Sequence, residues 1–194
     1  MKKKVIIIEG PDNCGKDTLI NELIKDYKCP AILHAMTPPS GVRSFASLFD
    51  FYNDGIIQDT LKYLYDKEHD AIIHNRSMYG EFVYGPKYRG QLPSETARLI
   101  SKLETMALRT FLFSNELYFI LLTSSSANLL VNNDDGKSIS NKAADIEDEI
   151  NAFDTIFNLS RIENKRRFYV NDGDCFIDKN VILNKVKSFI AEGD

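Results

Sequence analysis

Short apolar runs alternate along the chain with amphipathic helical patterns. Continuous apolar runs predict buried strands at 5–8, 31–35, 71–74, 117–123 and 168–170. Apolar residues at helical spacing predict helices at about 16–27, 42–67 (interrupted near 53–55), 94–113, 144–165 and 178–191. Glycine, proline and polar residues predict irregular connections at 37–41, 80–93 and 132–141. This alternation of strands and helices predicts a parallel α/β sheet with helices on both faces.

The charge order within 144–165 also bears on the helix expected there. Acidic residues come first and basic residues last, which suits the dipole of a single continuous helix.

Composition narrows the class of protein. A chain of 194 residues is expected to form one domain over 1–194. With 24 basic and 28 acidic residues the net charge is −4, which makes a nucleic-acid partner improbable. The apolar runs are too short for a signal peptide or a membrane span. An odd number of cysteines without paired spacing (Cys14, Cys29 and Cys175) indicates reduced thiols and a cytoplasmic location.

A glycine loop follows the first predicted strand and opens the first predicted helix. Its sequence matches G-x-x-x-x-G-K from Gly10 to Lys16. In this context the loop N–H groups cradle a β-phosphate, and Lys16 bridges the β- and γ-phosphates. The predicted ATP-binding residues of this loop are Gly10, Pro11, Asp12, Asn13, Cys14, Gly15, Lys16, Asp17 and Thr18.

Position 17 departs from the usual motif, in which a serine or threonine hydroxyl follows the lysine and binds Mg²⁺. Asp17 stands there instead. A carboxylate is a strong oxygen ligand, so Asp17 is a candidate to hold Mg²⁺ directly or through water. The alternative is an ordinary acidic residue in the first turn of a helix.

Three segments carry a resemblance to a known family. Residues 9–18 read E-G-P-D-N-C-G-K-D-T, residues 75–77 read N-R-S, and residues 80–90 read G-E-F-V-Y-G-P-K-Y-R-G. These resemble thymidylate kinases and thymidylate-kinase-like proteins, many of them phage-encoded. The resemblance implies a P-loop NTPase fold: a three-layer α/β/α domain with a five-stranded parallel sheet and a lid at about 132–151. It also implies ATP as phosphate donor, Mg²⁺ as cofactor and a possible homodimer, for which the apolar face of the 94–113 helix is a candidate surface.

The same resemblance assigns catalytic roles to Lys16, Asp12 and Arg76. Arg76 would clamp the acceptor phosphate, which suits the forked donors of a guanidinium. Asp12 would lie near the acceptor sugar and the transferred phosphate. Asn75 stands where the family has aspartate, so a carboxylate is missing at 75 and extra at 17. This exchange either conserves the charge around Mg²⁺ or marks weakened metal binding.

Further phosphate contacts are expected from lysines and arginines in two loops. Family members often supply arginine from the lid, but residues 132–151 contain Lys137 and Lys142 and no arginine. Lysine can neutralise phosphate as a point charge. In the 80–90 segment, Lys87, Arg89 and the aromatic Tyr84 beside them are candidates on the acceptor side.

The acceptor base is harder to place. Phe45, Phe49 and Tyr52 share one helix face, a spacing that usually means core packing. The resemblance puts a base-stacking ring in this region, and Phe49 is taken as the candidate, with Arg43 beside it. The three histidines (His34, His69 and His74) lack the spacing of a metal or acid–base site and are interpreted as structural.

The function expected from these features is a nucleoside monophosphate kinase. It would transfer the γ-phosphate of ATP to dTMP or a related pyrimidine deoxynucleotide. Two alternatives remain at this stage: a P-loop kinase acting on a modified base in DNA, and a non-catalytic nucleotide-binding regulator.

Overall fold

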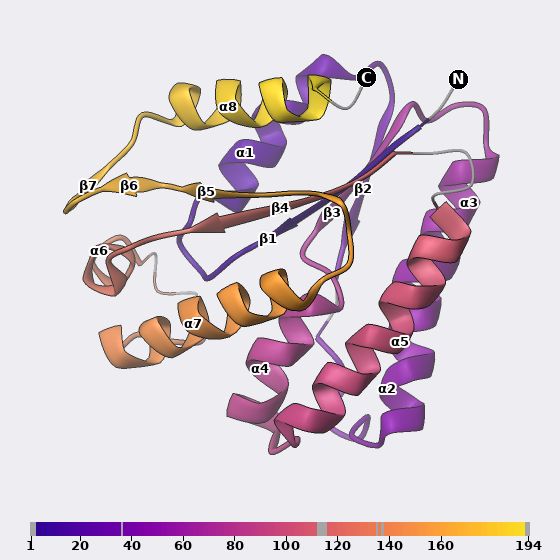
Figure 1. Ribbon diagram of the computed structural model, residues 1–194, viewed down its shortest axis with the longest axis horizontal. Helices are drawn as coiled ribbons and strands as arrows, with labels where there is room; N and C mark the ends of the chain where they lie inside the picture. Colours follow the sequence, from indigo (N-terminus) through magenta and orange to yellow (C-terminus); the bar gives the residue numbers. More distant parts are fainter. Residues whose placement is uncertain (1–2, 36, 112–115, 135, 137, 193–194) are drawn as a thin grey trace.

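A five-stranded parallel sheet lies at the centre of the molecule, with strand order β2-β3-β1-β4-β5 (Figure 1). The computed structural model describes residues 3–35, 37–111, 116–134, 136 and 138–192. The strands are β1 (Lys4–Glu9), β2 (Pro30–His34), β3 (Ala71–Asn75), β4 (Glu116–Thr123) and β5 (Asn164–Tyr169). The inner strands β1 and β4 are buried almost throughout, as their continuous apolar runs predict. The loop after β1 therefore emerges near the middle of the sheet edge.

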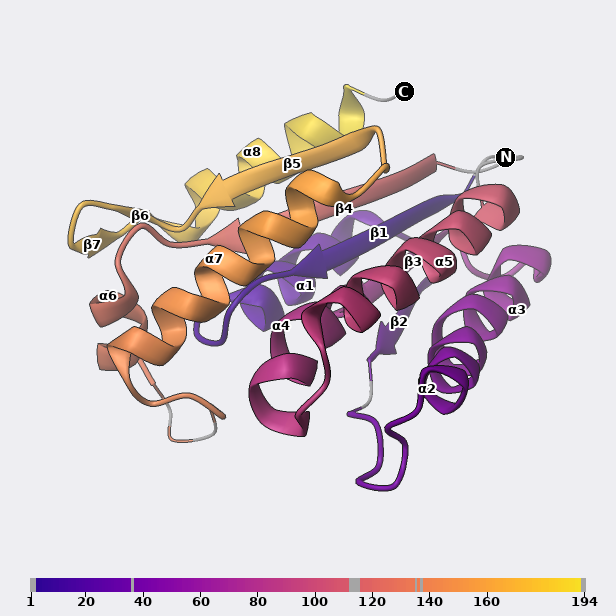
Figure 2. The same cartoon turned by 60° about the horizontal axis from the view of Figure 1, so that its bottom comes forward.

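Helices cover both faces of this sheet, which confirms the three-layer α/β/α prediction (Figures 1 and 2). On one face lie α1 (Lys16–Leu23), α6 (Ala127–Asn132) and α8 (Lys179–Ala191). On the other lie α2 (Phe45–Tyr52), α3 (Asp59–Tyr65), α4 (Tyr79–Arg89), α5 (Pro93–Phe111) and α7 (Ala143–Leu159). Successive β1 side chains enter opposite layers, with Ile6 and Ile8 toward α1 and α8 and with Val5 and Ile7 toward α5 and α7.

The segment 80–93, predicted to be irregular, is mostly the helix α4. Gly80, Gly85 and Pro86 lower its helix propensity, and Pro86 removes one internal hydrogen bond. Packing outweighs this cost, because α4 buries one face against α5 and α7. The helix stops at Gly90, whose φ of 68° is the left-handed conformation that favours glycine.

The helix predicted over 144–165 ends early, at Leu159. Ser160 is extended, and Asn164–Tyr169 joins the sheet as β5 beside β4. The basic residues assigned to the helix end therefore lie beyond it, where Arg161 pairs with Glu104 of α5. The prediction of one continuous helix over 144–165, which the helix dipole seemed to favour, was wrong. Pairing with β4 stabilises residues 164–169 more than another helical turn would.

Several short elements escape the sequence patterns. The predicted interruption near 53–55 is a π-helical turn, η2 (Asn53–Gln58), that joins α2 to α3. A short 3₁₀ turn, η1 (Ile24–Asp26), follows α1. The helix α6 and the small hairpin of β6 (Asn171–Asp172) and β7 (Cys175–Phe176) were not expected. The predicted end of the 94–113 helix lies partly outside the described residues.

The apolar face of α5, the surface considered for a dimer, is already occupied. Leu99, Ile100, Leu103, Ala107 and Phe111 are buried in the chain's own core. A homodimer would therefore need another surface. Among the described residues, no helix has the length and apolar character needed to cross a membrane.

Candidate active site

The phosphate-loop motif forms a tight turn between β1 and α1. Gly10 passes so close to β4 that a Cβ atom there would lie 2.1 Å from the carbonyl oxygen of Leu122. Asn13 and Gly15 have φ values of 63° and 76°, and Gly15 caps the start of α1. Successive turns of this kind direct backbone N–H groups into one concavity, the geometry that binds phosphate.

Lys16 reaches back over this loop. Its Nζ donates to the carbonyl oxygens of Gly10 at 2.9 Å and Pro11 at 2.5 Å, and the side chain is buried. Burial, together with the nearby Arg76 cation, lowers the pKa of Lys16 to about 8. An anion placed here would stabilise the charged lysine, so the loop is electrostatically prepared for phosphate.

Arg76 follows β3 and points across the site to the phosphate loop. Its φ of 67° is unusual for a residue other than glycine, while its N–H donates to Ile8 at 3.0 Å and anchors the turn. The guanidinium forms an ion pair with Asp12 and donates to the Tyr84 hydroxyl at 3.2 Å. Burial alone would raise the pKa of Asp12, but Arg76 and Lys16 outweigh it and hold the pKa below its usual value. The three predicted catalytic residues thus lie together.

Glu9 supports this turn from beneath. Its Oε1 accepts from the backbone N–H of Ser77 at 2.6 Å and from the Ser77 hydroxyl at 2.8 Å. Its Oε2 is buried, and no described residue bonds to it. Burial raises the pKa of Glu9 to about 7. Glu9 therefore holds the Arg76 turn in place, and its charge state is sensitive to pH near neutrality.

The two positions that depart from the family pattern touch each other. The amide Nδ2 of Asn75 donates to Oδ1 of Asp17 at 2.6 Å. Asp17 is exposed and borders the cavity described next. The missing and the extra carboxylate are thus linked by direct contact, which the sequence separation of the two residues did not reveal.

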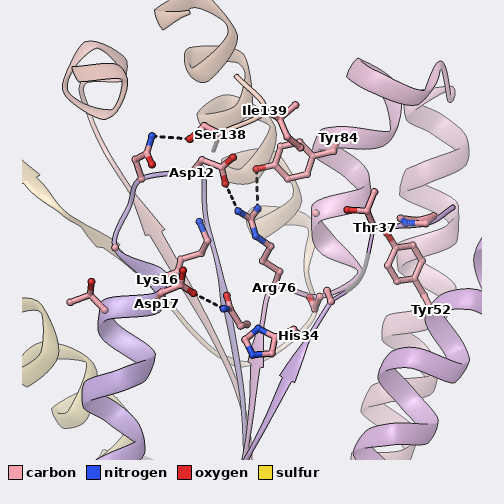
Figure 3. A pocket seen from close by; sticks show the side chains of 18 of the residues that line it. Asp12, Lys16, Asp17, His34, Thr37, Tyr52, Arg76, Tyr84, Ser138 and Ile139 are labelled. Carbon is pink, nitrogen blue, oxygen red and sulfur yellow. Dashed lines mark hydrogen bonds and ion pairs between the residues drawn. The ribbon is translucent and has the colours of Figure 1, made fainter. Parts of the chain in front are cut away.

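These groups line one large cavity of about 660 Å³ at the carboxyl edge of the sheet. Figure 3 shows Lys16 and Asp17 on the α1 side, Thr37 and Tyr52 on the opposite side, and Arg76 between them. The cavity is lined by Asp12, Asn13, Gly15, Lys16, Asp17, Thr18, His34, Ala35, Thr37, Pro38, Tyr52, Asn75, Arg76, Ser77, Gly80, Tyr84, Arg89, Asn133, Ser138 and Ile139. Its lining thus extends from the phosphate loop past Arg76 to Tyr52.

A second, mainly apolar cavity of about 200 Å³ lies on the other side of the phosphate loop. Cys14, Gly15 and Thr18 border it from the loop and α1. Phe176 and Ile177 border it from the segment between β5 and α8. The two cavities share Asn13, Gly15, Thr18 and Asn133, so they meet at the phosphate loop.

Part of the predicted lid lies over the phosphate loop. Asn13 donates from Nδ2 to the Leu130 carbonyl at 3.2 Å and to the Ser138 hydroxyl at 3.0 Å. Ser138 and Ile139 border the large cavity. The latter half of the predicted 132–151 segment belongs to α7, which begins at Ala143. The part that approaches the site is the connection between α6 and α7.

Some predicted ligand contacts lie away from the cavity. Lys87 forms ion pairs with Asp145 and with the buried Glu149 of α7 and is not part of the cavity lining. Phe49 packs under the Lys102 ammonium of α5, at 4.3 Å from ring centroid to Nζ. Arg43 is exposed and donates to the Ser40 carbonyl at 2.9 Å.

Neither lysine of the predicted lid is found in the cavity lining of the described residues. Lys142 is exposed at the start of α7, outside the cavity lining. Lys137 lies outside the described residues.

The cavity also contains residues that sequence reasoning assigned elsewhere. His34, interpreted as structural, is exposed and borders the cavity. His74 is structural, since it is buried and its Nε2 lies 2.9 Å from the Thr60 hydroxyl. Of the aromatic stripe on α2, it is Tyr52 and not Phe49 that borders the cavity. In the sequence, only its hydroxyl group could have distinguished Tyr52 from Phe45 and Phe49.

Comparison with known proteins bears on the fold alone. No known family's sequence profile matches the chain, and no curated protein matches it in sequence. Solved structures do match. Thymidylate kinase from Candida albicans has a TM-score of 0.66 at 12% identity, covering 99% of this chain and 92% of that one. The YorR protein from Bacillus subtilis, solved with phosphorylated GDP, has a TM-score of 0.64 at 17% identity, covering 96% and 95%.

A third similar structure is polyphosphate kinase 2 from Arthrobacter aurescens, with a TM-score of 0.59 at 12% identity, covering 98% of this chain and 67% of that one. At such low identities a match carries information on architecture and not on substrates. The chain has the three-layer α/β/α P-loop fold that these kinases share.

Proposed function

We propose that this protein is an ATP-dependent nucleoside monophosphate kinase. The observation that carries the proposal is the single cavity that holds both the phosphate-loop lysine and Arg76, with Asp12 paired to Arg76. A transfer between two phosphates needs two anions held in line with their charges neutralised. Lys16 at the loop and Arg76 at the end of β3 supply cations to the same cavity from two different elements.

The second cavity supports ATP as donor. It is mostly apolar and adjoins the phosphate loop at Gly15 and Thr18, where a nucleoside attached to a bound triphosphate would extend. Phe176 offers an aromatic ring at its wall. A flat purine suits such a lining. The acceptor would then occupy the large cavity beyond Arg76.

In the proposed reaction an oxygen of the acceptor phosphate attacks the γ-phosphorus, and the bond from that phosphorus to the β,γ-bridging oxygen breaks, leaving ADP. Arg76 would exchange Asp12 for the acceptor phosphate and orient the attacking oxygen. Lys16 would leave the Gly10 and Pro11 carbonyls and follow the charge that develops on the transferred group. Ser138 and Ile139 would help to exclude water.

The residues at the loop suit Mg²⁺. Asp17 borders the cavity, and among the described residues no donor is paired with its Oδ2. No cluster of three or more His, Cys, Asp or Glu side chains in the described chain suits a metal by itself. Mg²⁺ is commonly held by one or two carboxylates together with substrate phosphates, so Asp17 and Thr18 are the candidates. The ion would neutralise charge on the phosphates.

The acceptor that we propose is dTMP or a related pyrimidine deoxynucleotide. The resemblance of residues 75–90 to thymidylate-kinase-like proteins supports this choice. The experiment is a panel of deoxynucleoside and ribonucleoside monophosphates incubated with Mg·ATP, with ADP release as readout. Phosphorylation of a pyrimidine monophosphate is expected. ATP binding without turnover on any mononucleotide would contradict the proposal and favour a regulator, whereas turnover only on DNA would favour a DNA-base kinase.

Lys16→Ala tests the mechanism. Because the lysine contact strengthens as charge develops on the transferred phosphate, we expect kcat to fall by about 10² or more. The matched control is Lys185→Ala, an exposed lysine of α8 outside both cavities. Circular dichroism of both variants checks that the fold is retained. Near-normal turnover of Lys16→Ala would exclude the proposed role of the loop.

A further inference from the structure

A buried carboxylate organises the end of the large cavity beyond Arg76. Glu81 of α4 is 0% exposed. Its Oε2 accepts from the Tyr52 hydroxyl at 2.5 Å and from Nη2 of Arg89 at 2.5 Å. Its Oε1 accepts from Nε of Arg89 at 3.2 Å and from the amide of Gln91 at 2.5 Å. One carboxylate thus fixes three side chains, one from α2 and two from the end of α4 and the residues just after it.

Two of these side chains border the cavity, namely Tyr52 and Arg89. Because both bond to the same Glu81 oxygen, they lie next to each other. Figure 3 shows Tyr52 on the side of the cavity opposite Lys16 and Asp17, with Arg76 between. Arg89 therefore belongs to the end that lies farthest from the phosphate loop.

The guanidinium of Arg89 has N–H donors that no described residue uses. A guanidinium carries five N–H groups in one plane. The Glu81 carboxylate takes the edge formed by Nε and Nη2. This leaves the N–H groups of Nη1 and the second N–H of Nη2, which form another edge of the same plane. That edge can present two parallel donors to a ligand.

The charge of Arg89 is balanced by a fully buried partner through both carboxylate oxygens. Arg76 differs, since its ion pair uses one oxygen of Asp12, whose side chain is 13% exposed. Detaching Arg89 would leave Glu81 buried without its cation, which is costly. The sequence suggested that Arg89 contacts phosphate. Because the pair with Glu81 already neutralises its charge, the free edge of Arg89 attracts a phosphate less than Arg76 does and suits a neutral acceptor group.

We propose that Arg89, held in place by the positioning residue Glu81 and flanked by the Tyr52 ring, recognises the base of the acceptor nucleotide and selects bases that present a carbonyl oxygen at that edge. This inference rests on the proposed kinase function. An edge of donors pairs with the acceptor oxygens of thymine, uracil or guanine. The amino groups of cytosine or adenine at the same edge would face donor to donor.

The structure around Glu81 fits this role. At Gly85, one helical turn after Glu81, an added Cβ would lie 2.4 Å from Oε1 of Gln91 and 2.7 Å from Oε1 of Glu81. At Gly80 on the same helix, the nearest atoms would be 3.6 Å and 3.8 Å away, both in the Tyr84 ring. Gly85 therefore leaves room for the cluster, while Gly80 is tolerant.

The test compares dTMP and dGMP with dCMP and dAMP as acceptors, for wild type, Arg89→Lys and Gly85→Ala. The matched control is Arg161→Lys, because Arg161 also donates to a buried glutamate, Glu104, but lies outside the cavity. Arg89→Lys keeps the charge beside Glu81 and loses the fork. We expect at least a 10-fold rise in KM for the preferred carbonyl-bearing acceptors, with little change for the amino-bearing pair or for ATP. Gly85→Ala should give a smaller change in the same direction.

Calorimetric binding of the same four nucleotides separates the two proposals. Phosphorylation of all four with no loss of selectivity in Arg89→Lys would overturn the role of Arg89 and leave the kinase proposal intact. Selective binding that depends on Arg89, without any phosphorylation, would overturn the kinase proposal and support the recognition role. A wild-type preference for dCMP or dAMP would overturn the proposed base chemistry. Equal effects of Arg89→Lys and Arg161→Lys would reduce Arg89 to a structural role.

Discussion

At the scale of single residues, Asp17 and Asn75, the two positions that depart from the family pattern, are in direct contact. The amide donates to the carboxylate at 2.6 Å, so each residue limits what the other can be. An aspartate at 75 would bring two carboxylates together. A serine at 17 could still accept from the Asn75 amide but would place no negative charge there.

The pair predicts a specific double-mutant cycle. Asp17→Ser alone and Asn75→Asp alone should both lower activity at limiting Mg²⁺, the second also through repulsion from Asp17. The double variant should recover part of the loss, because the serine hydroxyl can donate to the new carboxylate. We expect a coupling of about 0.5–3 kcal/mol in transition-state terms. Mg²⁺ titrations of activity measure it, with ADP affinity in the absence of metal as the control; additive single effects would refute the link.

Glu9 predicts a pH dependence of stability. Burial raises its pKa in the folded chain to about 7, against an ordinary value of 4.5. Between these two pH values the folded state holds a proton that the unfolded state has lost, so stability falls as pH rises from 4.5 to 7. Glu9→Gln cannot titrate and should lack this slope. Relative to wild type it should gain about 1–3 kcal/mol on going from pH 5 to pH 8.

Urea denaturation of both proteins at the two pH values checks this expectation. The comparison is of differences between pH values, so any constant effect of the amide cancels. An identical pH slope in wild type and Glu9→Gln would show that other groups control it.

At the scale of elements, the passage of the phosphate loop past β4 predicts unequal effects at two glycines. A Cβ at Gly10 would collide with the backbone of Leu122, at 2.1 Å from its oxygen, and that backbone belongs to a central strand. At Gly15, φ is 76° but no atom lies within 4 Å of the added Cβ.

Gly15→Ala should therefore cost about 1 kcal/mol of stability, the strain of a left-handed conformation. Gly10→Ala should cost more than about 3 kcal/mol or prevent folding, since β1 and β4 would have to separate. Thermal denaturation of the two variants measures both costs. Equal costs would mean that the loop moves away from β4 with ease.

At the scale of the whole molecule, Glu149 joins three regions. From α7 it accepts from the Tyr88 hydroxyl of α4 at 2.9 Å and from the hydroxyl of Ser140, which lies in the connection over the phosphate loop. Burial raises the pKa of Glu149 above its ordinary value. The helix α4 and the connection at 138–142 are thus tied through one buried side chain.

We expect Glu149→Ala to release this connection. Hydrogen exchange at 138–142 should rise by about 10-fold or more, because the loss of two hydrogen bonds to a charged group is worth well over 1.4 kcal/mol. The matched control is Glu147→Ala, an exposed glutamate on the same helix. Unchanged exchange in Glu149→Ala would show that the Asn13–Ser138 bond holds the connection alone.

The sequence by itself determined the three-layer arrangement and the position of the phosphate-loop motif. Apolar runs such as 5–8 can be satisfied only by burial on both faces, which dictates a parallel sheet with helices on each side. The glycine spacing from Gly10 to Lys16 is set by local backbone geometry, so it could be recognised without any long-range information. Arg76 was placed through its resemblance to a known motif, and the structure brings it to Asp12.

Only the tertiary structure decided the helix α4, the end of α7 and the far end of the cavity. Packing of α4 against α5 and α7 outweighs the propensities of Gly85 and Pro86, and pairing with β4 removes 164–169 from a helical pattern. Tyr52, Glu81 and Arg89 meet across 29 and 8 positions of sequence. Their meeting depends on how the helices pack, because a side-chain contact between distant elements leaves no periodic signal along the chain.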